Sequence, residues 1–194
     1  MKSVKSEDRP LGAKGSVLNI DTGLLRRLRP VETAAEALAV ALIRNECRRW
    51  MTHNTHALDV KQQMDFLNHE LRRRRPAPRF CLLIVEGRRA PEDWIPMGYA
   101  VLRRDRRRLW LTGGLATPFR GQGHGRWLFT TLLRLAEVAD WEPWLEVRKS
   151  NRRALRLYQS LGYAEVQSSK FKVKKGVLVM RRPRTKNHES TTKP

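Results

Sequence analysis

Runs of hydrophobic residues predict several buried strands in this chain. Three continuous apolar runs, at 80–85, 95–102 and 109–117, follow one another with short polar connections. Such runs are typical of strands covered on both faces, and their close succession predicts an antiparallel meander. Within the third run, the pair Gly113–Gly114 would permit a bulge. Another strand is predicted at 144–147.

Helical spacing of apolar residues appears in four other segments. An Ala- and Leu-rich segment after Pro30 predicts a helix that runs to Met51, since proline suits the first helical turn. The residues from Val60 to Leu71 predict a second helix, with Asp59 as its cap. Two more helices are expected over about 123–138 and 151–161.

The ends of the chain complete the predicted order of elements. A first strand is expected at 24–29, and two closing strands are expected at 163–166 and 177–180. The order is then strand, two helices, three strands, helix, strand, helix and two strands. This order predicts a single domain with a mixed α/β sheet.

Three segments are expected along the chain. Residues 1–20 form a disordered basic tail, residues 21–182 form one domain, and residues 183–194 form a disordered polar tail. No apolar run reaches the roughly 20 residues that span a bilayer, and the first residues lack the apolar stretch of a signal peptide. We therefore expect a cytoplasmic protein without a membrane partner.

Charge is the most unusual feature of the composition. Forty Lys and Arg residues oppose 19 Asp and Glu residues, which leaves a net charge of +21. Such an excess attracts nucleic acid, ribosomes, acidic proteins and phosphorylated cofactors. The alternative is an arginine-rich surface that is simply solvated, and the composition alone leaves both interpretations open.

The few cysteines and histidines do not form a metal-binding pattern. Cys47 and Cys81 are isolated and are expected to be small core residues. His53 and His56 lie close together, but no other Cys or His stands at ligand spacing from them. We therefore expect no metal ion.

A glycine-rich motif between the third meander strand and the next helix suggests an anion site. Glycines at alternate positions let backbone N–H groups face one side, and the start of the following helix adds positive charge. The candidate residues of this cradle are Arg120, Gly121, Gln122, Gly123, His124, Gly125 and Arg126. One alternative is a tight turn that only packs the helix on the sheet. A dinucleotide site is another, but the spacing R-x-x-G-x-G and the preceding meander count against it.

A second motif, L-E-V-R-K-S-N-R-R-A-L-R-L-Y-Q-S-L-G-Y at 145–163, follows the cradle. With R-x-x-G-x-G before it, the chain resembles the GNAT superfamily of acetyl-coenzyme A-dependent N-acetyltransferases over about residues 80–182. The second motif is most similar to the branch that acetylates the N-termini of ribosomal proteins. The resemblance implies a GNAT acyltransferase fold, which has a mixed, mostly antiparallel sheet of about six or seven strands, splayed central strands and about four flanking helices.

The resemblance also implies roles for individual residues. The cradle would hold the pyrophosphate of acetyl-coenzyme A, and Asn151 and Tyr158 would lie beside the pantetheine arm and the sulfur. Backbone groups at the end of the splayed strand would pair with that arm, at Leu115, Ala116 and Thr117. Pro118 stands two residues before Arg120 instead of the three usual in relatives, which leaves this register open by one residue.

The chemistry of acetyl transfer requires groups of the same kind. An attacking amine must lose a proton, and the carboxylate of Glu146 is the candidate base. No acidic residue lies between Asp105 and Glu137, so the preceding strand offers no rival base. Tyr158 is the candidate acid for the leaving thiolate, and an amide near Leu115 or Ala116 could stabilise the developing oxyanion. The alternatives are an ordinary strand carboxylate, a packing tyrosine and, for Asn151, a helix cap.

The acceptor is less well defined than the acetyl donor. In this family it meets the first helices, their loop and the last hairpin, here Arg44, Asn45, Arg48, Arg49, Trp50, 51–56 and 168–175. Alternation would place Lys170, Lys172 and Lys174 on one strand face, either as a contact surface or as a solvated edge. We expect transfer by direct attack in a ternary complex to a protein N-terminus or lysine.

Other functions remain open at this point. The acceptor amine could instead belong to nucleic acid or aminoacyl-tRNA, as in acetyltransferase toxins, or to an amino sugar. A polyamine fits poorly with the positive field. The non-enzymatic alternative is a basic nucleic-acid-binding module on a degenerate fold of the same kind.

Overall fold

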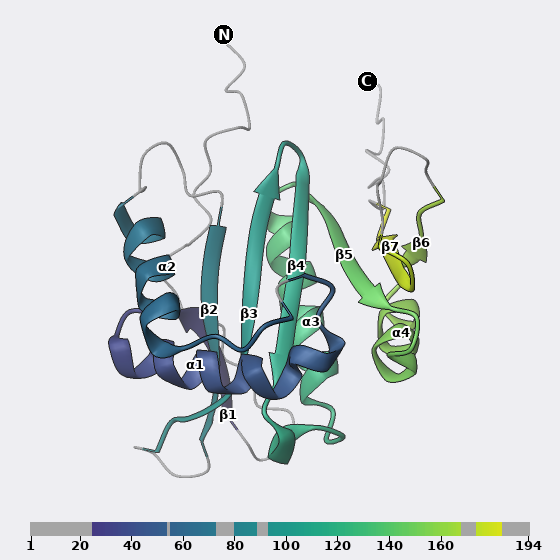
Figure 1. Ribbon diagram of the computed structural model, residues 1–194. Helices are drawn as coiled ribbons and strands as arrows, with labels where there is room; N and C mark the ends of the chain where they lie inside the picture. Colours follow the sequence, from purple (N-terminus) through teal and green to yellow (C-terminus); the bar gives the residue numbers. More distant parts are fainter. Residues whose placement is uncertain (1–24, 54, 73–79, 89–92, 168–173, 184–194) are drawn as a thin grey trace, which may run out of the picture.

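The computed structural model describes residues 25–53, 55–72, 80–88, 93–167 and 174–183 (Figure 1). These residues form a seven-stranded sheet with four α-helices, in the predicted order. The elements are β1 (Leu25–Pro30), α1 (Ala34–Cys47), a 3-10 turn η1 (Arg48–Trp50), α2 (Val60–Arg72), β2 (Phe80–Arg88), β3 (Ile95–Asp105), β4 (Arg108–Leu115), a 3-10 turn η2 (Thr117–Phe119), α3 (His124–Val138), β5 (Glu142–Arg148), α4 (Arg152–Ser160), β6 (Ala164–Glu165) and β7 (Val177–Arg181). The expected tails fall in the undescribed ends.

The sheet has the strand order β1-β2-β3-β4-β5-β7-β6, and every neighbouring pair is antiparallel except β4 and β5. Helices α1 and α2 cover one face, while α3, which connects the parallel pair, covers the other (Figure 1). The predicted fold class is confirmed. No helix in the described part of the chain is both long and apolar enough to cross a bilayer.

Side chains from the two faces of the sheet form separate cores. On the α3 face, Leu111, Leu145 and Leu132 belong to a cluster that also includes Tyr158 and Tyr163. On the α1 face, Val40 and Ile43 of α1 pack with Ile84 and Tyr99. Alternation along each strand therefore directs neighbouring residues into different cores, and both faces are buried, as the continuous apolar runs predict.

Strands β4 and β5 are paired only at one end. Three residue pairs join them, of which Trp110 with Trp144 is the last, although both strands continue beyond this point. Strand β5 is held instead by β7, over the five pairs from Trp144–Arg181 to Arg148–Val177. The two central strands consequently diverge, and Figure 1 shows the opening between them.

Two local predictions are wrong. Gly113 and Gly114 pair in continuous register with β3, and the irregularity lies between Val85 and Glu86 instead. A Cβ atom on Gly114 would lie 2.7 Å from Cys47 Sγ, so this glycine permits close packing of α1 on β4 and not a bulge. Pro30 ends β1 and does not open the helix.

The first helix and the last hairpin also differ from the prediction. Helix α1 begins after Thr33, whose hydroxyl accepts from the Glu36 N–H, and it ends at Cys47 with η1 after it. The hairpin segment 168–173, with Lys170 and Lys172, lies outside the described residues. Lys174 is not part of a strand.

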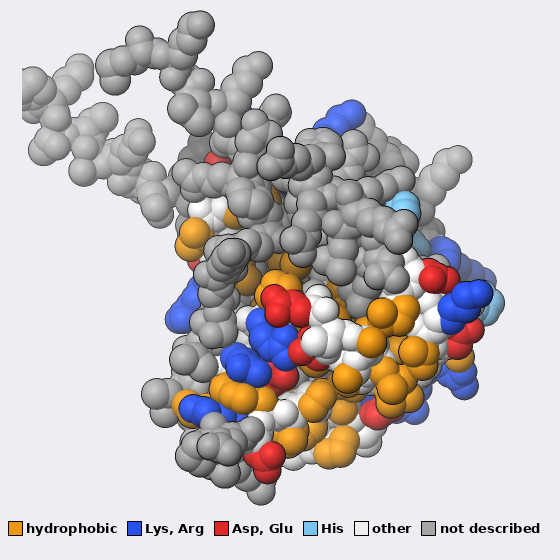
Figure 2. Space-filling view, turned by 90° about the vertical axis from the view of Figure 1, so that its left-hand side faces the viewer, with side chains coloured by type: hydrophobic (Ala, Val, Ile, Leu, Met, Phe, Trp, Pro, Cys, Tyr) orange, Lys and Arg blue, Asp and Glu red, His pale blue; other side chains and the backbone are white. Residues whose placement is uncertain are grey.

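Figure 2 views the side of the molecule formed by the first helices and shows hydrophobic side chains gathered there beside charged ones. Leu38 and Leu42 of α1 are exposed, as is Val60 at the start of α2. Leu38 and Leu42 are one turn apart on α1, so these two side chains form a stripe opposite the residues that enter the core.

An ion-pair network joins β1, β2 and α1. Glu86, which is buried, accepts from Arg27 Nε at 2.6 Å and from Arg29 Nε at 2.9 Å, and Arg29 also donates to Glu36. Burial opposes ionisation of Glu36, but hydrogen bonds from Arg29 and from the Glu32 and Thr33 N–H groups outweigh it and lower its pKa to about 2. The network therefore fixes the start of α1 against the edge of the sheet.

We expect Glu36→Gln to reduce the free energy of unfolding at pH 7 by about 1 kcal/mol, because an amide can keep the helix cap but not the ion pair with Arg29. The native pKa of Glu36 is depressed, so its contribution is present above the ordinary value of 4.5 and is lost as the pH falls toward about 2. Urea unfolding should show that the difference in free energy of unfolding between the wild type and Glu36→Gln decreases from pH 7 to pH 3. Glu32→Gln, with the same change of charge, is the control, and an equal loss in it would contradict the assignment.

Candidate active site

The glycine motif forms the start of α3, as predicted. Gly121 and Gly123 have φ values of 91° and 83°, in the left-handed region that glycine adopts most easily. Gly123 is the N-cap residue, no side chain caps the helix, and the first helical hydrogen bond runs from the Trp127 N–H to Gly123 O. The N–H groups before Trp127, including those of His124 and Gly125, therefore have no carbonyl partner within the helix and lie at the positive end of its dipole.

Most side chains of the motif turn away from this N-terminus. Arg120 donates to Leu115 O at 2.8 Å, and His124 is buried with Nδ1 3.3 Å from Arg26. Burial lowers the pKa of His124, and the charge of Arg26 lowers it further. Gln122 donates to Pro118 O, and Arg126 donates to Ser160 Oγ at 2.8 Å. The motif offers an anion mainly its backbone.

A cation beside the cradle was not identified from the sequence. A Cβ atom on Gly121 would lie 2.9 Å from the Arg153 guanidinium, which α4 brings to the loop. Arg153 lies in the second motif, where roles were predicted for Glu146, Asn151 and Tyr158 but not for Arg153. The pair Arg152–Arg153 in the first turn of a helix was the available signal, and only the packing of α4 reveals which of the two faces the loop.

The gap between β4 and β5 is lined by backbone groups without strand partners. The Ala116 N–H donates to Met97 O at 2.8 Å, so alternation turns the N–H groups of Gly113 and Leu115 the other way, toward β5. On β5, the Lys149 N–H donates to Gly176 O on the β7 side, and the same alternation turns the backbone of Glu146 toward β4. The gap thus has a hydrogen-bonding edge on each side.

Of the three backbone positions predicted to pair with the pantetheine arm, only Leu115 has its N–H in the gap. The Ala116 N–H bonds Met97 O, and the Thr117 N–H donates to Glu46 Oε2 at 2.8 Å. The Thr117 hydroxyl also donates to Glu46, at 2.7 Å. Together with Gly113, Leu115 therefore forms the open edge, which begins two residues before the predicted segment.

A cavity of about 640 Å³ opens on the α1 face and reaches the gap. Its walls come from α1, α2 and strands β2 to β5, and through Asn151 and Tyr158 from the α4 side as well. The cavity is also lined by Leu111 and Gly113, two β4 residues on the face of the sheet that α3 covers. The cavity consequently connects the α1 face of the sheet with the second motif.

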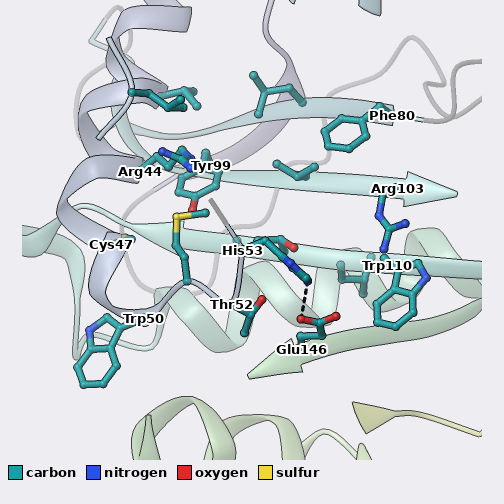
Figure 3. Close-up of a pocket in the computed structure, with 18 of the residues that line it drawn as sticks. Arg44, Cys47, Trp50, Thr52, His53, Phe80, Tyr99, Arg103, Trp110 and Glu146 are labelled. Atoms are coloured by element: carbon teal, nitrogen blue, oxygen red, sulfur yellow. Dashed lines mark ion pairs between the residues drawn. The ribbon is translucent and has the colours of Figure 1, made fainter. Parts of the chain in front are cut away.

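Glu146 lies in this cavity, close to a histidine from the loop after η1. Its Oε2 atom is 2.8 Å from His53 Nε2, and the two side chains point toward each other in Figure 3. Arg148 Nε donates to Met51 O at 2.7 Å and thereby ties the same loop to β5. The sequence analysis included His53 in the acceptor loop but did not pair it with Glu146, because 93 residues separate the two in the sequence.

Tyr158 reaches the same cavity from α4. Its ring packs edge-on against Phe129 and Tyr163, with centroid distances of 4.8 and 5.9 Å. Burial raises the pKa of Tyr158, and nearby Tyr99 raises it further, so the hydroxyl stays protonated at neutral pH. Asn151 caps α4 by accepting from the Ala154 N–H at 3.2 Å while it also lines the cavity. The structural and the functional interpretations of both residues are compatible.

These features fit a long, thin ligand that has an anionic end. The helix N-terminus and Arg153 suit the anion, and the two strand edges can bond a chain that contains amide groups. Within the described ranges, no group of three His, Cys, Asp or Glu side chains is arranged to hold a metal ion.

Comparisons with known proteins agree with this geometry. A profile described as the acetyltransferase (GNAT) family matches residues 39–163. A comparison with curated protein sequences gave no significant match.

Solved structures with the same fold include a ribosomal-protein-alanine N-acetyltransferase from Brucella melitensis, with 22% identity, a TM-score of 0.60, and 80% of this chain and 98% of that one covered. A spermidine N-acetyltransferase from Vibrio cholerae in complex with CoA and spermine has 17% identity, a TM-score of 0.64, and coverage of 80% and 92%. The yncA protein of Salmonella typhimurium with its cofactor acetyl-CoA has 19% identity, a TM-score of 0.60, and coverage of 80% and 92%.

The family profile spans both motifs and most of the elements between α1 and α4. It covers well over half of the chain, and the splayed strands, the glycine cradle and the cavity all lie within the matched region or border it. On this evidence the chain belongs to the GNAT family of acetyltransferases and is an N-acetyltransferase that uses acetyl-coenzyme A.

Proposed function

We propose that this enzyme transfers the acetyl group by direct attack of a primary amine, with both substrates bound at once. Bound acetyl-coenzyme A supplies an activated thioester. The observation that carries the proposal is the single cavity that contains both Glu146 and Tyr158 and opens into the β4–β5 gap. An amine entering from the α1 face and a thioester lying in the gap can meet there without a covalent enzyme intermediate.

Each residue of the site has a distinct task in this proposal. The cradle and Arg153 bind the diphosphate, and the edges at Gly113, Leu115 and Glu146 align the pantetheine arm. The carboxylate of Glu146 accepts the proton of the amine, and His53 fixes the orientation of that carboxylate through the 2.8 Å contact. Tyr158, whose proton is retained because its pKa is raised, donates it to the departing sulfur.

A protein N-terminus or lysine is the acceptor that we favour. The second motif supports it, as does the similarity of fold to the Brucella melitensis ribosomal-protein-alanine N-acetyltransferase. The cavity also opens on the α1 face, where a chain end can enter. An amine on RNA is the second candidate, favoured by the net charge of +21.

Labelled acetyl-coenzyme A incubated with a fractionated lysate tests the proposal. We expect label in the protein fraction with the wild type and none with Glu146→Gln. Label in RNA or only in small molecules would contradict the protein acceptor, and absence of enzyme-dependent label from every fraction would contradict acetyl transfer itself.

We expect Gly123→Glu to weaken acetyl-coenzyme A binding by about tenfold or more, because it adds negative charge where the helix dipole binds the diphosphate. Gly176→Glu is the control for backbone strain. Gly176 has a φ value of 80°, close to the 83° of Gly123, and the space around the Cβ position is open at both sites. Titration calorimetry measures the two affinities. Equal weakening in both variants would remove the cradle from the binding site.

Replacement of Glu146 by Gln should lower kcat by about 10²- to 10⁴-fold, because the amide cannot accept the proton of the amine. The surface variant Glu165→Gln makes the same change on exposed β6 and should keep the wild-type rate. Thiol release with a reactive acceptor provides the rate. A wild-type kcat in Glu146→Gln would exclude this carboxylate as the base.

For Tyr158→Phe we expect a kcat about 10²-fold lower with little change in acetyl-coenzyme A affinity, because only the proton donor is lost. Tyr163→Phe is the matched control: its hydroxyl is buried without a hydrogen-bond partner among the described residues, and its ring lies 5.9 Å from that of Tyr158. Steady-state kinetics and calorimetry separate the two effects. If the two variants behaved alike, Tyr158 would have only a packing role.

A further inference from the structure

The charge of the cavity walls bears on which amine they accept. Glu146 is the only carboxylate among the described lining residues, and it is already paired with His53. The guanidinium groups of Arg44 and Arg103 line the same cavity. A polycation such as spermidine would meet walls of its own sign, whereas an acceptor with a negative group would be attracted.

Arg103 is the cation that is placed to bind such a group. It lies on β3, it is exposed, and within the described part of the chain its side chain makes no hydrogen bond or ion pair. Its one recorded contact is with Trp110, where the guanidinium carbon lies 5.2 Å from the ring centroid. Figure 3 shows Arg103 reaching over Trp110 on the side of the sheet that carries Glu146. Its N–H edge therefore remains available to a ligand.

A stack of aromatic and cationic side chains holds Arg103 in position. Trp110 packs on Trp144 with a centroid distance of 5.7 Å, and Arg108 and Arg181 lie over Trp144 at 4.8 and 5.9 Å. Both tryptophans are buried, so the platform under Arg103 is rigid. A guanidinium that is already ordered loses less entropy when it binds a carboxylate through paired hydrogen bonds.

The strand register sets the spacing between Arg103 and Glu146. Arg103 pairs with Trp110, and Trp110 pairs with Trp144, so these residues form one row across the sheet. Glu146 lies two residues further along β5, which is about 7 Å along the strand and at least about 10 Å across the sheet at the backbone, because β4 and β5 diverge beyond this row. Side chains shorten this distance, so one small molecule or two neighbouring peptide residues can span it.

The rest of the cavity favours an apolar body between the two charged ends. Phe66, Phe80 and Tyr99 line it together with aliphatic side chains. Gln63 of α2 is only 4% exposed and lies in the same wall. An amide in such a wall can bond a polar group of a ligand, so the cavity combines apolar and polar lining.

From these observations we infer that the acceptor is an amine that also carries a carboxylate, with the amine at Glu146 and the carboxylate bound by Arg103. This inference rests on the proposed function and names the substrate class of the same site. The carboxylate belongs either to a free amino acid or to an acidic residue next to the N-terminal residue of a peptide. Spermidine, the acceptor named for the Vibrio cholerae enzyme, is excluded by the same argument.

Paired probes test the inference. One pair is phenylalanine and phenylalanine amide, and the other is alanyl-aspartyl-phenylalanine amide and alanyl-asparaginyl-phenylalanine amide, with spermidine as the cationic comparison. Calorimetry with CoA-saturated protein gives binding without turnover, and thiol release with acetyl-coenzyme A gives kcat/KM. In at least one pair we expect the carboxylate probe to be favoured by about 10- to 100-fold. The pair that shows the preference identifies the source of the carboxylate.

Arg103→Gln should abolish that preference, while Arg104→Gln should retain it. Arg104 follows directly on β3 and lies over Trp141 on the opposite face, so both variants lose one positive charge, on opposite faces of the sheet. Thermal melting checks that both variants are folded. The inference would be overturned if the wild type bound the probes without a carboxylate, or spermidine, as tightly as the carboxylate probes. An equal loss of preference in both variants would overturn it as well.

The two proposals fail in different ways. If the carboxylate probes bind with an Arg103-dependent preference but no acetyl group is transferred to any amine, the proposed function fails and the assignment of Arg103 stands. If neutral amines are acetylated as well as acidic ones, the enzyme activity stands and the carboxylate site fails.

Discussion

The divergence of β4 from β5 after Trp110 is the constraint on which the rest of the site depends. A continuous ladder at this point would satisfy both strand edges and leave no room between the two halves of the molecule. Because β5 is held by β7 instead, the backbone of Gly113 and Leu115 faces an open gap. The cradle lies where β4 ends and α3 begins, and the cavity with Glu146 opens onto the same gap. One interruption in strand pairing therefore places the cradle, the gap and the cavity with Glu146 next to one another.

Much of this architecture follows from local patterns in the sequence. The apolar runs predicted the meander, and the helix stripes predicted α2, α3 and α4 to within a few residues. Asp59, predicted as a cap, accepts from the Gln62 N–H at 2.7 Å. The cradle at Gly121 and Gly123 was predictable because it depends on local properties, namely glycines that can adopt a positive φ and a helix that begins directly after them. The two motifs together were sufficient to identify the family.

The side chains that complete the site depend on contacts between distant segments. Arg120 and His124 belong to the glycine motif, but their partners Glu46 and Arg26 are 74 and 98 residues away in sequence. Spacing along the chain cannot show that these two side chains turn away from the cradle while Arg153 turns toward it. The pairing of His53 with Glu146 and the stacking of Arg103 on Trp110 are hidden for the same reason. A motif specifies the backbone of such a site more reliably than the direction of its charged groups.

The link between α1 and the start of the cradle has a consequence for how the two substrates act together. Glu46 is held by both donors of Thr117 and by Arg120, and Arg120 also contacts Cys47 Sγ at 3.4 Å. The last turn of α1 lines the cavity through Cys47, so a shift of the loop that holds Thr117 and Arg120 would also move part of the cavity wall. Occupancy of one pocket would then alter affinity at the other, and thermodynamic reciprocity makes the two effects equal in size. In the proposed function, Glu46 would therefore couple the binding of the two substrates.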